Sequence, residues 1–323
     1  MLHTSIQTSG LLTEKNFDEY DTKLALLEEA GFDALDHNLN IHYSSNDVRT
    51  NKRSSFFDLE LSELFLKLVP FKKSAFAHKL YFGQLHAPYP SYIVGNTGFI
   101  NEYMLEVLKK SIALTSFFES ELLVVHPITS SYVTSAKEEK RLNFEMYKSL
   151  IPYARTYNVK ICLENMFHTT KAHNLCEACC SNAEEAVFYI DSLNEIAGEE
   201  LFSFCFDLGH ANVLGKNIRK SLNTLGHRVR CLHIHDNDAR QDLHMIPYSF
   251  STNWGIDMYT DWNGFISGLA DIGYNGTLNF EVHQAFHVFP KAVHKEMLTL
   301  LNAIGRNFAN EINSQINIKN AVH

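Results

Sequence analysis

Residues 161–167 read ICLENMF, a short apolar run that turns polar at Glu164. The same arrangement recurs along the chain in QLHAPYP (84–90), LLVVHPI (122–128), FCFDLGH (204–210), CLHIHD (231–236) and LNFEVH (278–283). Short apolar runs of this kind are typical of strands buried in a parallel sheet. Every run ends on histidine, aspartate or glutamate, and the carboxyl ends of parallel strands meet at one edge. We therefore expect these polar side chains to gather at one end of a barrel.

Strand-like runs alternate with longer amphipathic stretches throughout the chain. The predicted strands lie near 3–8, 33–38, 80–86, 121–127, 159–165, 202–208, 229–235 and 277–282. The predicted helices lie near 17–30, 58–70, 99–117, 137–156, 183–193, 215–225, 259–272 and 290–310. In these stretches apolar residues recur at three- and four-residue spacing. The alternation indicates βα units around a parallel sheet.

Eight strands and eight helices in 323 residues fit a single (β/α)8 TIM barrel, an α/β fold. The alternative, an open doubly wound sheet, would gather functional residues after two or three strands. Here such residues follow at least six of the eight predicted strands, and no Gly-rich dinucleotide fingerprint follows the first. We expect one barrel over residues 1–310, followed by a polar, frayed C-terminal tail at 311–323.

Three segments that follow predicted strands look like long loops, at 39–57, 166–182 and 236–258. In a barrel they lie over the catalytic face, where long loops shape specificity or act as lids. Aromatic residues after the strands are candidates either for stacking on a bound substrate or for pinning the loops to the barrel. They are Tyr89, Phe167, Tyr248, Phe250, Trp254 and Trp262.

The formal net charge is −9, from 28 basic and 37 acidic residues. This balance argues against a nonspecific nucleic-acid binder, so we expect no nucleic-acid partner. No apolar stretch reaches the roughly 18 residues of a membrane span, and the N-terminal residues lack the pattern of a signal peptide. We expect a cytoplasmic protein with no membrane partner. Cys162, Cys205 and Cys231 lie in strand-like runs and are expected to be small buried hydrophobes rather than parts of a disulfide framework.

Four candidate ligands end the fifth to eighth predicted strands: Glu164, Asp207, His233 and Glu281. A closed barrel places them side by side at its mouth. Three carboxylates and one imidazole suit a divalent ion such as Mn, Zn, Co or Mg, with coordination positions left open for substrate oxygens. One alternative is that each is an ordinary strand-end polar residue, but four on consecutive strands favour a metal site.

Further candidates lie nearby at His86, His126, His210, Asp242 and His244. Each could bind substrate or an additional ion. His235 faces the same side of its strand as His233, since side chains alternate along a strand, so it could replace His233 as the ligand.

These residues resemble the xylose isomerase-like TIM barrel superfamily, which holds sugar isomerases and epimerases together with endonuclease IV. The most specific motifs are LEN (163–165), DLGHAN (207–212), HIHDND (233–238) and FEVH (280–283). Similarity to ketose 3-epimerases implies that the four strand-end residues bind one divalent ion. It also implies that Glu164 and Glu281 form the acid/base pair and that His210 touches the substrate. The epimerase arginine should follow the metal histidine by six positions, whereas Arg240 lies seven beyond His233.

Similarity to endonuclease IV would instead recruit nine residues into a cluster of up to three metals. In that pattern His86 and His126 join Glu164 at one ion, and His210, Asp242 and His244 hold another. The chain departs from it at DLGH, where the nuclease pattern has a DTCH-type run, and after Asp242-Leu-His244, where a Gly-rich turn is missing. The acidic charge also weighs against DNA repair.

The favoured function is a metal-dependent sugar isomerase or epimerase that transfers a proton next to a carbonyl through an enediolate. One carboxylate removes the proton and the other returns it. The alternatives are a multi-zinc phosphodiesterase and a lyase or hydrolase acting on a keto-glycoside. The expected partner is a small sugar, and exposed helices such as 137–156 could pair two copies into a homo-oligomer.

Overall fold

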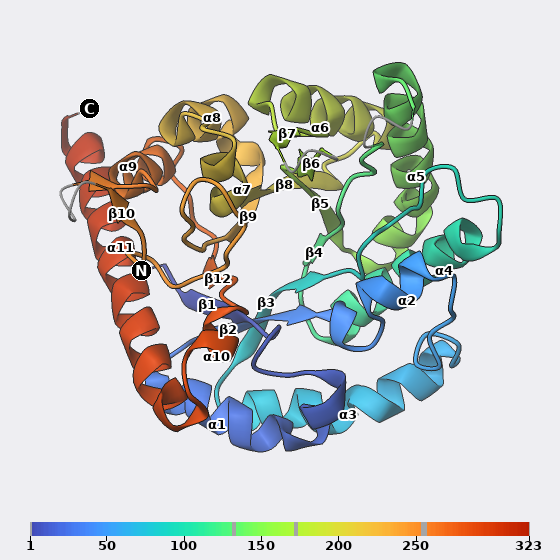
Figure 1. The fold of residues 1–323 in the computed structure, drawn as a ribbon, viewed down its shortest axis with the longest axis horizontal. Helices are drawn as coiled ribbons and strands as arrows, with labels where there is room; N and C mark the ends of the chain where they lie inside the picture. Colours follow the sequence, from blue (N-terminus) through green and yellow to red (C-terminus); the bar gives the residue numbers. More distant parts are fainter. Residues whose placement is uncertain (1, 131–133, 171–173, 253–256, 323) are drawn as a thin grey trace.

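A computed structural model describes residues 2–130, 134–170, 174–252 and 257–322. Eight parallel strands follow the order β12-β1-β2-β3-β4-β5-β8-β9 (Figure 1). The remaining gap between β9 and β12 is bridged by Ile234, whose amide donates to Asn279 and whose carbonyl accepts from Glu281. The sheet is therefore a nearly closed barrel, and the predicted TIM-barrel fold is confirmed.

The barrel strands lie close to the predicted runs. Their bounds are β1 Thr4–Gln7, β2 Ala34–Asn38, β3 Tyr81–His86, β4 Leu122–Val124, β5 Lys160–Glu164, β8 Phe202–Asp207, β9 Val229–His233 and β12 Leu278–Phe280. The helices between and after them are α1 Tyr20–Ala30, α3 Leu61–Ala77, α4 Ile100–Phe117, α5 Ala136–Tyr157, α6 Ala183–Ala197, α8 Ile218–Leu225, α9 Trp262–Asp271 and α11 His294–Val322. These helices form the outer ring (Figure 1).

Helix α5 shows why the sequence pattern was informative. Ser135 begins it by accepting a hydrogen bond from the Glu138 amide, and Asn158 ends it in the left-handed conformation. Its buried face carries Tyr147, Leu150 and Ile151, the three- and four-residue spacing that predicts an amphipathic helix.

The three long loops carry structure of their own at the mouth of the barrel. Residues 39–57 contain α2 (Ser45–Arg49). Residues 166–182 contain the hairpin of β6 (Phe167–Thr169) and β7 (Leu175–Glu177). Residues 236–258 contain β10 (Ser251–Thr252) and β11 (Asp257–Met258). Two short helices, α7 (Leu208–Val213) and α10 (Ala285–Val288), also follow strand ends.

Small side chains fill part of the barrel interior beneath the polar strand ends. Cys162, Cys205 and Cys231 pack with Val124 and are fully buried. All six cysteines lie within the described residues, and none of them forms a disulfide bond. The expectation that the three strand cysteines act as buried hydrophobes is therefore confirmed.

The C-terminal segment differs from the expectation. Residues 311–322 continue α11 instead of forming a frayed tail, because Ile312 is completely buried and Lys319 pairs with Asp271 of α9. Apolar residues among polar neighbours hold this stretch against the barrel. Among the described residues, no helix is both long enough and apolar enough to cross a membrane.

Candidate metal centre

The four strand-end candidates lie together at the carboxyl end of the barrel. Glu164, Asp207 and His233 are the last residues of β5, β8 and β9, and Glu281 directly follows β12. All four are buried, and Asp207 pairs with His233 in the strand register. Closure of the barrel thus brings together residues that are up to 117 positions apart.

The Nδ1 atom of His233 lies among the three carboxylates. It is 3.1 Å from Glu281 Oε2, 3.4 Å from Glu164 Oε2 and 3.7 Å from Asp207 Oδ2. Within the described part of the chain, Asp207 Oδ2 and both His233 ring nitrogens are buried and make no hydrogen bond of acceptable geometry. Buried polar atoms are rarely left without a partner, so this donor set fits a divalent cation.

A second group of ligand atoms lies on one side of Glu164. His126 Nε2 is 2.9 Å from Glu164 Oε2 and 2.9 Å from His86 Nε2. Nδ1 of His86 faces the Ala87 carbonyl oxygen at 2.7 Å. That contact orients the ring and leaves Nε2 as the atom turned toward the centre.

A third group surrounds Asp242. His244 Nε2 lies 2.8 Å from Asp242 Oδ2, and His210 Nε2 lies 3.5 Å from the same oxygen. Nδ1 of His210 faces the Asn165 carbonyl oxygen at 2.8 Å, and Nδ1 of His244 faces that of Glu281 at 3.1 Å. Backbone carbonyls therefore orient both rings with Nε2 toward the carboxylate.

The two candidate imidazoles at the end of β9, those of His233 and His235, have different neighbours. His233 Nε2 lies 3.4 Å from Asp36 Oδ2, which accepts hydrogen bonds from Gln84 and Asn279. His235 Nε2 instead lies 3.2 Å from Asp207 Oδ1 and 3.6 Å from Asp242 Oδ1. His233 thus belongs to the three-carboxylate group, while His235 joins that group to the one around Asp242.

The DLGH motif has a structural reason for its glycine. A Cβ at Gly209 would lie 1.8 Å from the His235 ring. The DTCH-type run of the nuclease pattern carries a side chain at this position, so it is incompatible with the His235 placement seen here. Asp207 also caps α7 by accepting from the His210 amide at 2.7 Å, which fixes its carboxylate.

The LEN motif also holds the centre in place. The Asn165 side chain donates to the Asp207 carbonyl oxygen and accepts from the Asp207 amide, at 2.7 and 2.8 Å. It therefore locks the ends of β5 and β8 together. The motif was visible in the sequence, but this positioning role required the pairing of the two strands.

The pKa shifts follow from burial and from opposite charges. Burial by itself would raise the pKa of Glu164, but His126 and His233 hold it well below its usual range. Burial likewise opposes a lowered pKa at Glu281, where His233 and His244 prevail. For His244 burial acts against protonation, yet Asp242 raises the pKa to about 9. Both glutamates are therefore ionised at neutral pH.

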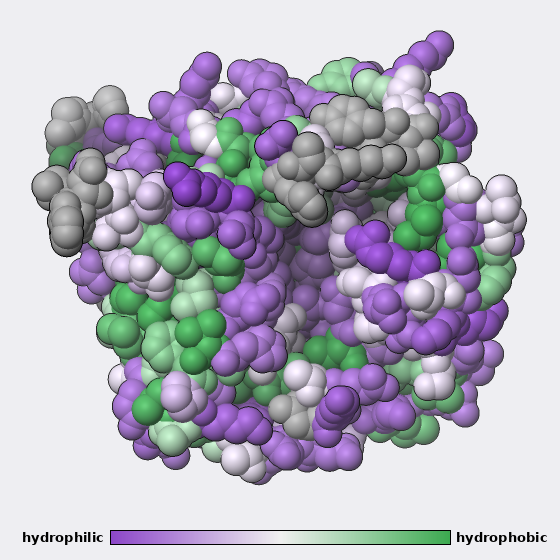
Figure 2. Space-filling model, in the orientation of Figure 1, coloured by the Kyte–Doolittle hydropathy of each residue, from purple (hydrophilic) through white to green (hydrophobic). Residues whose placement is uncertain are grey.

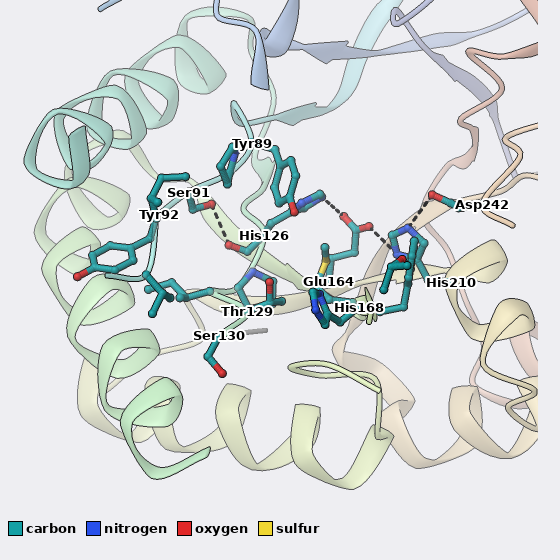
Figure 3. Close-up of a pocket in the computed structure, with 18 of the residues that line it drawn as sticks. Tyr89, Ser91, Tyr92, His126, Thr129, Ser130, Glu164, His168, His210 and Asp242 are labelled. Atoms are coloured by element: carbon teal, nitrogen blue, oxygen red, sulfur yellow. Dashed lines mark hydrogen bonds and ion pairs between the residues drawn. The ribbon is translucent and has the colours of Figure 1, made fainter. Parts of the chain in front are cut away.

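A cavity of about 520 Å³ opens from this centre. Glu164, His210, Asp242, His244 and Glu281 line it. Figure 3 shows Tyr92, Thr129 and Ser130 on the side of Glu164 away from Asp242. In the space-filling view a hollow near the middle of this face is rimmed mainly by hydrophilic residues (Figure 2). The cavity therefore reaches from the ligand groups to the protein surface.

Several residues that line the cavity were not among the residues predicted from the sequence. Arg49, His168 and His283 line the cavity, and the His283 ring lies 4.1 Å from that of His244. His283 was visible within FEVH, two residues after Glu281, but Arg49 carried no local signal. The exposed Arg240 is absent from the lining, so the structure does not bring it to the other candidates.

Four of the six aromatic candidates divide between two places. Tyr89 and Phe167 line the cavity. Tyr248 and Trp262 instead pack on Phe308 of α11, with ring centroids 6.0 and 5.5 Å away. Trp254 lies outside the described residues. Stacking on a substrate is thus available to Tyr89 and Phe167.

Comparison with known proteins gives a relative in sequence and solved structures with a similar fold. The chain is 27% identical over 232 residues to the uncharacterized protein MJ1311 of Methanocaldococcus jannaschii, covering 68% of this chain and 70% of that protein. A solved D-tagatose 3-epimerase-like protein has a TM-score of 0.68 at 17% identity, covering 98% of this chain and 100% of its own. The 3-keto-D-glucoside 4-epimerase YcjR of E. coli has a TM-score of 0.64 at 13% identity, with 94% and 100% covered.

A family model described as xylose isomerase-like TIM barrel matches residues 24–303. This match covers most of the chain, including the strand ends that carry Glu164, Asp207, His233 and Glu281. The chain therefore belongs to the xylose isomerase-like TIM barrel family.

Proposed function

We propose that this protein is a divalent-metal-dependent sugar isomerase or epimerase. The observation that carries the proposal is the pair Glu164 and Glu281, whose Oε2 atoms lie 3.4 and 3.1 Å from the same nitrogen of His233. Both carboxylates line the cavity. Two ionised carboxylates beside one bound substrate suit a reaction that removes a proton and returns it. The epimerase names of proteins with a similar fold support this choice.

The ion would be held by Glu164, Asp207, Glu281 and an imidazole, for which His233 and His235 are both placed. When bound, a divalent ion supplies a Lewis acid for the carbonyl and neighbouring hydroxyl oxygens of a sugar. The buried Asp207 Oδ2, which makes no hydrogen bond among the described residues, supports this assignment.

The residues of the chain carry the proton transfer. Glu164 and Glu281 are held ionised by neighbouring histidines, so either can accept the proton from the carbon next to the carbonyl. In an epimerisation the other glutamate takes up a proton from water and donates it to the opposite face of the same carbon, while the first glutamate releases its proton to water. In an isomerisation the first glutamate returns the proton to the neighbouring carbon. His210 and His244 line the same cavity, where they can hydrogen-bond sugar hydroxyls. Met166 and Phe167 contribute apolar surface to the cavity lining.

Glutamine replacements test this mechanism. In D2O, the wild-type protein loaded with metal should incorporate deuterium at the carbon next to the carbonyl of a turned-over ketose. Glu164→Gln and Glu281→Gln should each lower that rate by about 10²- to 10⁴-fold, the usual contribution of acid–base catalysis. Glu185→Gln is the control, because Glu185 is an exposed glutamate of α6 that lies outside the cavity lining. Full activity in both cavity variants would refute the mechanism.

A second candidate is a multi-metal phosphodiesterase. It is favoured by the two additional ligand groups, His86 with His126 and the histidines around Asp242, which flank the central one. The net charge of −9 and the glycine of DLGH oppose it. Elemental analysis of the purified protein separates the two functions, since one ion per chain favours the epimerase and three zinc ions favour the phosphodiesterase.

A third reaction, cleavage of a keto-glycoside, would use the same ion and the same carboxylates. It differs in product, because a glycosidic bond is broken and the group attached to the sugar is released. Chromatography of a keto-glycoside incubated with the protein distinguishes this reaction from epimerisation, which keeps the glycoside intact.

A further inference from the structure

The cavity extends beyond the candidate metal ligands. Beyond His126 it continues along Ser91, Tyr92, Thr129 and Ser130, which offer hydroxyl groups and one aromatic ring (Figure 3). Its volume of about 520 Å³ lies within the range of sites that enclose ligands of drug size. A sugar bound at the centre therefore has room for a substituent on the side away from Asp242.

One arginine lines the cavity beside Tyr89, which precedes Ser91 by two residues. Arg49 is the last residue of α2, and its Cζ lies 5.3 Å from the centroid of the Tyr89 ring. The Tyr89 ring in turn lies 4.8 Å from that of His126, whose Nε2 is 2.9 Å from Glu164 Oε2. A chain of contacts therefore leads from the guanidinium through the Tyr89 and His126 rings to Glu164.

The Arg49 guanidinium is available for a ligand. Nearby carboxylates are already engaged, since Asp47 pairs with Lys52 at 3.3 Å and Asp58 pairs with Arg53 at 2.8 Å. In the described ranges, no carboxylate lies within ion-pair distance of Arg49. Its side chain rests on an aromatic face, which fixes its position without neutralising its charge.

The charges of the cavity make Arg49 unusual. Glu164, Asp242 and Glu281 make the inner end acidic, while Arg49 is the one lysine or arginine among the described lining residues. An arginine offers a planar fork of donors that matches phosphate and carboxylate oxygens. A neutral sugar would gain little from such a group, whereas an anionic substituent held away from the inner carboxylates would gain a charge-assisted pair.

We propose that the substrate is a sugar carrying an anionic group, a phosphate or a carboxylate, at the end remote from the reacting carbonyl, and that Arg49 binds this group. This inference rests on the proposed function, because it places the reacting carbons beside Glu164 and Glu281. It assigns to Arg49 the selection of substrate and no part in proton transfer. Tyr89 positions the guanidinium at the cavity wall.

The test compares neutral ketoses with their terminal phosphates and with the corresponding keto-sugar acids on the metal-loaded protein. Dissociation constants come from calorimetry, and turnover comes from deuterium exchange in D2O. One of the two anionic series should bind about 10- to 100-fold more tightly than the neutral sugars, the range expected for a hydrogen-bonded charge pair. The series that shows this preference identifies the anionic group.

Arg49→Ala should abolish the preference by weakening anionic binding at least tenfold more than neutral-sugar binding, and Arg49→Lys should retain part of it. Arg155→Ala is the matched control, because this exposed arginine lies in the last turn of α5, at the opposite end of the barrel. Equal loss of neutral and anionic binding in Arg49→Ala would overturn the proposal, as would a wild-type protein without any anionic preference.

Failure of the proposed function has a different signature. If no sugar exchanges its proton but the Arg49-dependent preference in binding persists, the isomerase assignment fails and the anionic site stands. If sugars exchange their protons without any effect of Arg49→Ala, the anionic site fails and the isomerase assignment stands.

Discussion

Replacing Gly209 with alanine should displace the His235 imidazole from the candidate metal centre. The added Cβ would lie 1.8 Å from Cε1 and 2.4 Å from both ring nitrogens of His235. Since ordinary van der Waals contact begins at 3.4 Å, the ring must move by at least 1.6 Å. Metal–ligand distances tolerate only about 0.2 Å. The displaced ring could no longer share an ion with Asp207 or Asp242.

The expected size of the effect follows from two opposing contributions. Alanine is better than glycine in a helix by up to about 1 kcal/mol, whereas overpacking a buried site costs about 1–3 kcal/mol. The variant should therefore be only modestly destabilised, by at most about 2 kcal/mol. Its affinity for a divalent ion should fall by about 10- to 100-fold, as when a residue that orients a ligand is lost.

The assay is a competition titration of the metal-free protein with zinc against a chromophoric chelator, together with thermal unfolding. Gly98→Ala is the matched control, because the nearest atom to its added Cβ is the end of the Asn96 side chain at 3.2 Å. Adding His235→Ala to the Gly209 variant removes the clash and should restore its melting temperature. An alanine variant at Gly209 with wild-type zinc affinity would refute the reasoning.

Three further predictions concern stability. Chelation of divalent ions should lower the melting temperature, and adding the ions back should restore it, because a buried carboxylate oxygen lacks a hydrogen-bond partner among the described residues. At a free ion concentration 100 times the dissociation constant, the bound ion should stabilise the folded chain by about 2.7 kcal/mol. An unchanged melting temperature after chelation would contradict this prediction. Burial lowers the pKa of His37 well below 6.5, so at mildly acidic pH only the unfolded chain binds a proton at this histidine. The free energy of unfolding should therefore decrease as the pH drops under 6.5, by about 2 kcal/mol at pH 5. His37→Phe should flatten the pH dependence of thermal unfolding, unlike His227→Gln at an exposed site, and an unaltered slope would count against it. Ile312→Ala should lower the free energy of unfolding, measured with denaturant, by about 2–5 kcal/mol. Ile318→Ala should lower it by less than about 0.5 kcal/mol, because the Ile318 side chain is 62% exposed. Equal effects of the two substitutions would show that α11 does not pack as described.

Much of the fold could be predicted from local patterns. The eight barrel strands overlap the predicted runs because a buried parallel strand needs a short apolar segment, and the helices between them need apolar residues at helical spacing. The C-terminal segment was missed, since Ile312 and Lys319 stand among polar residues. Their roles depend on contacts with the barrel and with α9, which no local pattern contains.

The candidate site divides in the same way. The sequence by itself determined that Glu164, Asp207, His233 and Glu281 end consecutive barrel strands, because chain order sets strand order in this fold. Only the tertiary structure decided how His233 and His235 differ, since their partners Asp36 and Asp242 come from other parts of the chain. It also brought Arg49, rather than Arg240, to the cavity. Strand-end position can be read along a chain, whereas the neighbours of a loop side chain depend on how distant segments pack.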